Sequence, residues 1–213
     1  MSREAKAKQR EGNEIEFSRI VAFSDGVFAI AITLLVLSLH LPRHLQDGEI
    51  ANAIWEQHEH FLAYGISFAV IGRFWVVHHR FFGEVIAFDG RLIGLNILYL
   101  GFVVLIPFSS EVLGEYGSKS AGVVVYAINL SAVVLIGMLM TVDARRAGLT
   151  SIDDATLRES LIRSGYIAGV FLLSIPVAVF APSAATYMWL ILFLDPSARI
   201  AHHRAKAAGP IDP

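Results

Sequence analysis

Long apolar blocks alternate with short polar segments along almost the whole chain. Five blocks are about as long as the roughly 20 mainly apolar residues that a helix needs to cross a bilayer, and a sixth is shorter. The blocks cover residues 20–41, 61–82, 92–110, 120–142, 161–180 and 183–194. The last block spans only if its helix continues through Asp195 and Pro196 toward His203. The pattern predicts an all-α, polytopic membrane protein with six transmembrane helices in residues 19–203.

Composition agrees with a membrane protein. The chain is 55% hydrophobic and 17% charged, with a mean hydropathy of +0.58, whereas an average soluble domain is about 45–50% apolar and about 25% charged. A net charge of −2 gives no basic footprint for nucleic acid. The absence of cysteine excludes disulfides and thiolate metal sites.

Lysine and arginine positions predict the orientation. With six spans and residues 1–18 as a cytosolic tail or short helix, the inner segments hold fourteen basic residues. The two outer ones are Arg43 and Lys119. Because basic residues accumulate on the cytoplasmic side, both termini, including a C-terminal tail over residues 204–213, are expected there.

The first apolar block contains a row of side chains on one helical face. Ile30, Leu34 and Leu37 follow the i, i+4, i+7 spacing, and Thr33 lies beside them. Asp25 lies about 140° around the helix from Ile30, at 100° per residue, so the two cannot face the same surroundings. Periodicity alone assigns the row to lipid or to a neighbouring helix.

Two motifs resemble a known family. Arg19-xxx-Phe23-Ser24-Asp25-Gly26 runs directly into VFAIAITLLVL, and the second block contains FWVVHHRFF over residues 74–82. Both are similar to the transmembrane protein 175 family, which includes the endosomal and lysosomal potassium channel and its bacterial relatives. The resemblance covers nearly the whole chain, although animal members carry two copies of the six-helix unit and this chain has one.

The resemblance implies a potassium-selective channel without a carbonyl filter, and no TVGYG-like sequence occurs in the chain. It implies that the first helices line the ion path, with the constriction at Ile30, a selectivity role for Thr33, and further apolar rings at Leu34 and Leu37. The residues themselves suggest only a weakly selective pathway for monovalent cations. One helix cannot enclose a pore, so a homo-tetramer in the inner (plasma) membrane is expected, with lipid, permeant K⁺ and its own copies as partners.

A carboxylate at the membrane edge needs a partner. The candidates for Asp25 are Arg19, Arg73, Trp75, His78 and His79. The resemblance implies hydrogen bonds between the Phe23-Ser24-Asp25 segment and the tryptophan and histidines of the second helix. We therefore expect Ser24, Asp25, Trp75 and one of the histidines to brace the first helix, without specifying which histidine takes part.

Other functions remain as alternatives. Asp25, Arg73 and the two histidines form the kind of ionisable set that relays protons in a secondary transporter, but no inverted repeat is evident. Titration of the histidines near pH 6.5 also allows proton gating, with neutral hydrogen-bonding roles as the competing interpretation. Adjacent histidines point about 100° apart, unlike the i, i+4 pair of a metal site, so neither an enzyme nor a resident metal or cofactor is expected.

Overall fold

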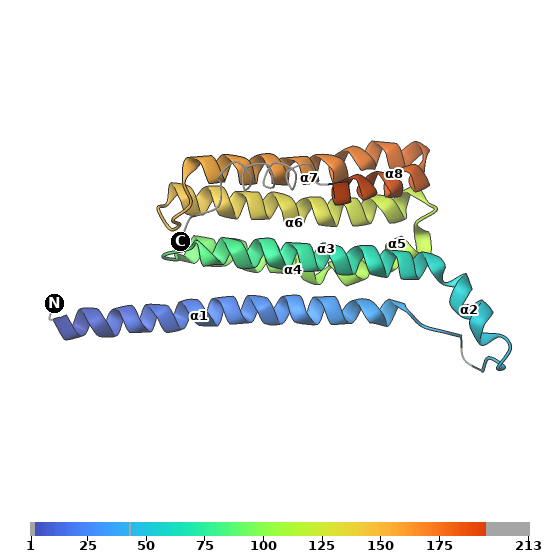
Figure 1. Cartoon of the computed structure of the whole chain (residues 1–213), viewed down its shortest axis with the longest axis horizontal. Coiled ribbons are helices and arrows are strands. Elements are labelled where there is room, and N and C mark those ends of the chain that lie inside the picture. Colours follow the sequence, from blue (N-terminus) through green and yellow to red (C-terminus); the bar gives the residue numbers. More distant parts are fainter. Residues whose placement is uncertain (1–2, 43, 195–213) are drawn as a thin grey trace, which may run out of the picture.

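Long helices lying side by side make up most of the molecule (Figure 1). The computed structural model describes residues 3–42 and 44–194 of the 213. Its elements are α1 (Arg3–Leu34), the 3₁₀ turn η1 (Leu35–Ser38), α2 (Ile50–Glu56), α3 (His58–Gly83), α4 (Gly90–Val104), α5 (Ile106–Tyr116), α6 (Ser120–Arg146), α7 (Asp154–Phe180), α8 (Pro182–Met188) and the 3₁₀ turn η2 (Trp189–Leu194).

Five helical segments are long and apolar enough to cross a membrane. They are Ile15–Ser38, His58–Gly83, Gly90–Tyr116, Ser120–Arg146 and Asp154–Phe180. The all-α, polytopic architecture is thereby confirmed. The sixth predicted block is helical as α8 and η2 but ends at Leu194 in the described part of the chain; its predicted continuation over residues 195–203 lies outside the described residues.

Two boundaries differ from the predicted blocks. Residues 3–18 are not a separate short element, because α1 runs from Arg3 without a break into the first span, and no proline interrupts it. The third span is divided at Leu105, and α5 begins at Ile106. Pro107, which has no N–H to donate, occupies the first turn of α5, where a helix needs no such donor.

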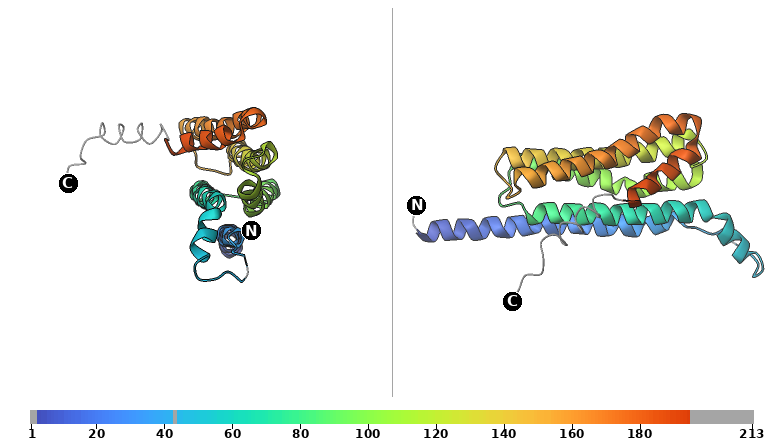
Figure 2. Two further views of the ribbon diagram at one scale, coloured as in Figure 1. Left: turned by 90° about the vertical axis from the view of Figure 1, so that its right-hand side faces the viewer. Right: turned by 45° about the horizontal axis from the view of Figure 1, so that its top comes forward.

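The helices occupy very different positions in the bundle. α6 lies at its centre and packs against α4, α5 and α7, whereas α1 lies at one edge and packs mainly on α3 and α4 (Figures 1 and 2). The largest buried side chains include Tyr126, Leu130 and Val133 of α6. The core is therefore completed around α6, and α1 contributes one face to it.

The two loops at the N-terminal side of the bundle are tied together. The backbone N–H of Ile86 donates to Leu149 O at 2.9 Å, and that of Ser151 donates to Glu84 O at 2.9 Å. Arg91 at the start of α4 forms an ion pair with Asp143 of α6 at 3.0 Å. These contacts hold α3, α4, α6 and α7 as one body, against which α1 is placed.

Candidate functional site

One face of α1 is packed into its own bundle. Ser24, Phe28, Ala31, Leu35 and Ser38 are all buried, at successive spacings of four, three, four and three residues. This spacing keeps one seam of a helix on a neighbour, as in coiled-coil packing. The seam fixes which way the rest of α1 faces.

A second face of α1 is not covered by any described part of the chain. Ile30 is 59% exposed, Leu37 is 71% exposed, and Phe23 and Leu34 are exposed as well. At 100° per residue these four side chains lie about 80–140° around the helix from Ser24 at the seam. Phe23 precedes Ile30 by seven residues and extends the row that the sequence predicts.

Thr33 is exposed close to this row. Its Oγ1 donates a hydrogen bond to the backbone oxygen of Ile30 at 2.8 Å. The hydroxyl hydrogen is therefore used within the helix, and the lone pairs of the hydroxyl oxygen stay available to an outside donor or cation. The face thus offers apolar side chains and one oriented oxygen.

A hydrogen-bond network between side chains runs from α3 through α4 to the seam of α1. His78 Nε2 and Asn96 Oδ1 are 2.8 Å apart, Asn96 Nδ2 donates to Ser24 Oγ at 3.0 Å, and Ser24 Oγ donates to Ile20 O at 2.9 Å. Because Asn96 Oδ1 can only accept, Nε2 of His78 carries a hydrogen. All three linked side chains are buried, so each depends on the others for its partners.

Asp25 is held by a separate contact, outside this hydrogen-bond network. Trp75 Nε1 donates to Asp25 Oδ1 at 2.9 Å, which joins α3 to the flank of α1. The ring of His79 stacks on Trp75 with centroids 5.4 Å apart, while His78 packs between Phe28 and Tyr99 at 5.3 and 5.4 Å. The two adjacent histidines therefore have different surroundings, and the buried one bonds to Asn96.

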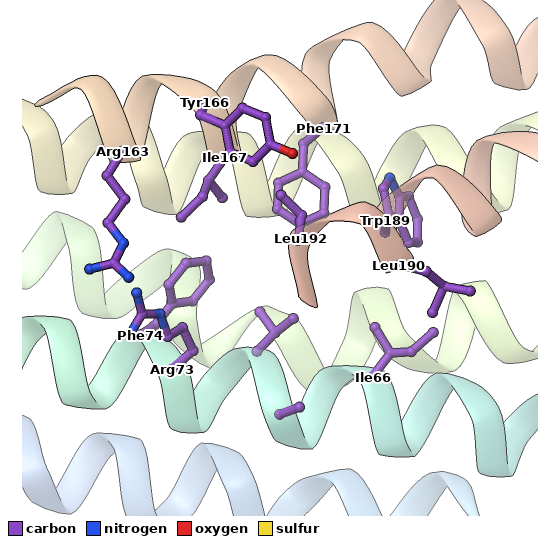
Figure 3. Close-up of a pocket in the computed structure, with 12 residues that line it drawn as sticks. Ile66, Arg73, Phe74, Arg163, Tyr166, Ile167, Phe171, Trp189, Leu190 and Leu192 are labelled. Atoms are coloured by element: carbon purple, nitrogen blue, oxygen red, sulfur yellow. The ribbon is translucent and has the colours of Figure 1, made fainter. Parts of the chain in front are cut away.

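The structure does not bring every predicted motif residue together. Arg73 lines a hollow between α3 and α7, and its guanidinium points toward Arg163 of α7 (Figure 3). Arg19 is exposed on α1. Asn96 was recognisable in the sequence as a polar residue within an apolar span, but its position between His78 and Ser24 follows only from how three helices pack.

The chain that follows α1 and η1 is anchored by the start of α3. The side chain of Gln57 donates to the backbone oxygen of His40. The rings of His40 and His60 have centroids 6.4 Å apart, and His60 Nε2 lies 3.4 Å from Glu115 Oε2 of α5. Within residues 3–42 and 44–194, no group of three or more His, Cys, Asp or Glu side chains is arranged to hold a metal ion.

A groove between α1 and α3 flanks the Asp25 contact. It has a volume of about 340 Å³ and is lined by Asp25, Ala29, Ile32, Gly72 and Trp75, among others. The groove lies on the opposite flank of α1 from Ile30. α1 therefore has three distinct sides: the packed seam, the apolar row and a hollow flank.

This combination defines a helical membrane protein in which α1, at the edge of the bundle, is braced by polar contacts and is apolar on its uncovered face. The family model of the endosomal/lysosomal potassium channel TMEM175 matches residues 19–107. A potassium channel of a Chryseobacterium species is 31% identical over 189 residues, which cover 85% of this chain and 94% of that protein. The chain belongs to the TMEM175 family.

Further relatives match over about half of the chain. A potassium channel of Streptomyces collinus is 45% identical over 101 residues, 47% of this chain and 49% of that protein, so the chain spans about half the length of this relative. The chicken endosomal/lysosomal proton channel TMEM175 is 38% identical over 125 residues, 54% of this chain and 25% of that protein.

A solved structure matches most of the chain. The crystal structure of a lysosomal potassium-selective channel TMEM175 homolog from Chamaesiphon minutus aligns with a TM-score of 0.73 and 29% identity. The alignment covers 86% of this chain and 97% of that chain. The fold is therefore that of a family member that has been named a potassium-selective channel.

Proposed function

We propose that the protein is a potassium channel, in which α1 helices from four copies surround a central ion path. The observation that carries this proposal is the apolar row on α1 that the described residues leave uncovered, on a helix that its own subunit holds along the seam and at Asp25. The names of the bacterial relatives support potassium as the permeant ion. The matched family model describes an ion channel, and no catalytic role is proposed.

The three sides of α1 suit a closed ring. The seam faces its own bundle, the row of Phe23, Ile30, Leu34 and Leu37 faces the axis, and the groove beside Trp75 receives the neighbouring subunit. Rotational symmetry repeats these contacts identically around the ring, as is usual in homo-oligomers. Small residues in the groove, Ala29 and Gly72, permit the close helix approach that membrane interfaces favour.

Ile30 forms the constriction in this arrangement. Four isoleucine side chains at one level make an apolar ring that blocks a hydrated ion by steric closure and by dewetting. The Thr33 oxygen, one turn away, supplies the nearby polar contact for a cation. Selectivity from one hydroxyl per subunit is modest, because few oxygens replace the ion's hydration shell.

The polar contacts set the rotation of the pore helix. Ser24, Asn96 and His78 hold the seam, and Trp75 holds Asp25 on one flank. Together they resist rotation of α1 about its own axis, which would move Ile30 away from the centre of the ring. This is the role we assign to the motif around Asp25.

The orientation follows from the charge distribution. In the predicted six-span topology, fourteen basic residues fall in the inner segments and two in the outer loops. By the positive-inside rule the termini are cytoplasmic, and the protein resides in the bacterial plasma membrane. The N-terminal part of α1 then projects into the cytoplasm.

Potassium flux from liposomes tests the assignment of Ile30. Ile30→Asn replaces the apolar ring by polar amides that hold water, so potassium release is expected to rise severalfold and discrimination against sodium to fall. Leu173→Asn is the matched control, since Leu173 lies within the membrane-spanning part of α7 and is 64% exposed. Equal flux through the two variants would contradict a gate at Ile30.

A proton-coupled transporter remains the second candidate. The vertebrate relatives named proton channels make proton movement worth measuring. A pH-sensitive dye in the same liposomes reports it. Transport that saturates with substrate concentration and requires a pH gradient would favour the transporter over the channel.

A further inference from the structure

A hollow on the other side of α3 from the pore helix is apolar along most of its length and basic at one end (Figure 3). Its volume is about 280 Å³, close to the ~300 Å³ lower limit of small-molecule pockets. Its apolar walls come from α3, α7 and η2. They include Val70, Phe74, Ile167, Phe171 and Trp189.

The basic end is formed by Arg73 and Arg163. Arg73 lies ten residues before the end of α3 at Gly83, and Arg163 lies nine residues after the start of α7 at Asp154. At 1.5 Å per residue both are about 14–15 Å from the helix ends on the same side of the bundle. Figure 3 shows both guanidinium groups directed into the space between the two helices.

A second, larger hollow adjoins this end. It has a volume of about 630 Å³ and shares Arg73, Arg163 and Ile167 with the first. Its other walls include the hydroxyl groups of Thr156, Ser160 and Ser164. Three arginines and two glutamates line it, Arg73, Arg80 and Arg163 against Glu84 and Glu159, which leaves one net positive charge.

We propose that these adjoining hollows bind one anionic phospholipid. The phosphate lies at Arg73 and Arg163, the headgroup occupies the hydroxyl-lined hollow, and an acyl chain extends between α3 and α7 toward Trp189. The lipid belongs to the leaflet on the side where α3 ends and α7 begins. The site is separate from the ion path, because α3 stands between this hollow and α1.

Charge and polarity select this ligand. Guanidinium groups bind phosphate oxygens in a bidentate manner, and each has five N–H donors, so it can bind a phosphate and keep its contacts within the protein. Long arginine side chains also extend from within a membrane toward its interface. A free phosphate would leave the apolar hollow unused, whereas a phospholipid fills both parts.

Lipid binding to the purified full-length protein tests the site. Native mass spectrometry of delipidated protein counts the bound molecules as phosphatidylglycerol or the zwitterionic phosphatidylcholine is added. We expect saturable binding of phosphatidylglycerol with a clear preference over phosphatidylcholine. Equal binding of the two lipids would overturn the proposal.

Variants locate the binding. Arg163→Gln is expected to weaken phosphatidylglycerol binding about tenfold or more, since it removes a charge-assisted hydrogen bond to the phosphate. Arg158→Gln, on an exposed part of the same helix, is the matched control. Arg163→Lys keeps the charge and should bind with intermediate strength. Identical binding by Arg163→Gln and Arg158→Gln would refute the role of the arginine.

The acyl-chain part of the site has its own test. Val70→Trp fills the apolar hollow without changing charge and should reduce lipid binding. The chain has no cysteine, so Val70→Cys can be combined with Ala198→Cys to ask whether the chain's own continuation occupies the hollow instead. Efficient cross-linking of this pair in membranes would overturn the lipid assignment.

Discussion

α6 and α1 are both long apolar helices, yet their surroundings are opposite. Half of the most apolar window of α6 is buried within the chain, against 22% of that of α1. α6 has buried side chains around most of its circumference, with Ile128, Leu135 and Leu139 exposed on one face, whereas α1 buries a single seam. α6 is therefore surrounded largely by its own subunit, while most of α1 is left facing lipid or, in the proposed channel, other copies of the chain.

The difference separates two kinds of apolar residue. In a bilayer, lipid is as apolar as leucine, so an exposed apolar side chain is not by itself a signal of assembly. The signal on α1 is that the uncovered row sits on a helix whose rotation is fixed by specific polar bonds.

The same substitution on the two helices should give the largest contrast. Leu130→Ala on α6 removes a side chain with 0% exposure and should lower the free energy of unfolding by about 2–5 kcal/mol through the cavity it leaves. Leu37→Ala on α1 removes one that is 71% exposed. It should leave subunit stability nearly unchanged while increasing potassium flux.

Reversible unfolding in detergent micelles measures the first effect and liposome flux the second. If Leu37→Ala destabilised the isolated subunit as much as Leu130→Ala does, the distinction between the two helices would be wrong.

Much of this contrast can be read from the sequence, but not all of it. The apolar blocks predict the membrane helices, because burial in lipid requires long apolar runs, and the spacing of Ile30, Leu34 and Leu37 groups these residues correctly on one face of α1. The sequence does not show which face of α1 its own bundle covers. That depends on α3 and α4, which lie far along the chain.

The polar contacts show the same limit. Trp75 was one of several candidates for Asp25, and helical depth made Arg73 another. Their different directions on α3 decide the outcome: Trp75 faces α1 and Arg73 faces α7. The choice between His78 and His79 also depends on packing, since adjacent residues on a helix differ by about 100° in direction.

Breaking the buried hydrogen-bond network of His78, Asn96 and Ser24 should have the next largest effect. Asn96→Ala leaves His78 and Ser24 without their shared partner, which should cost about 1–3 kcal/mol of stability for buried unsatisfied groups. The lost bonds fix the rotation of α1 in the wild-type protein. Without them, the measured ratio of potassium to sodium flux should also vary more from one preparation to the next.

Asn52→Ala on the exposed surface of α2 serves as the control. The double variant Ser24→Ala with Asn96→Ala should cost less than the sum of the single changes, since residues in one network are coupled. Strict additivity of the two changes in the free energy of unfolding would argue against one connected hydrogen-bond network.

The smallest effect should come from the flank of α1. Trp75→Phe keeps a ring to stack on His79 but removes the N–H that donates to Asp25. Asp25 and Trp75 are only partly covered, so water replaces part of the lost bond and the cost should be about 0.5–1.5 kcal/mol. Trp55→Phe is the matched control, because Trp55 is 77% exposed on α2.

The informative measurement is the ratio of tetramer to subunit after mild detergent extraction. If the indole N–H only stabilises the subunit, the ratio stays unchanged while the unfolding free energy falls. If it also orients α1 toward neighbouring copies, the tetramer fraction falls as well, and an unchanged ratio would remove Asp25 from the assembly role.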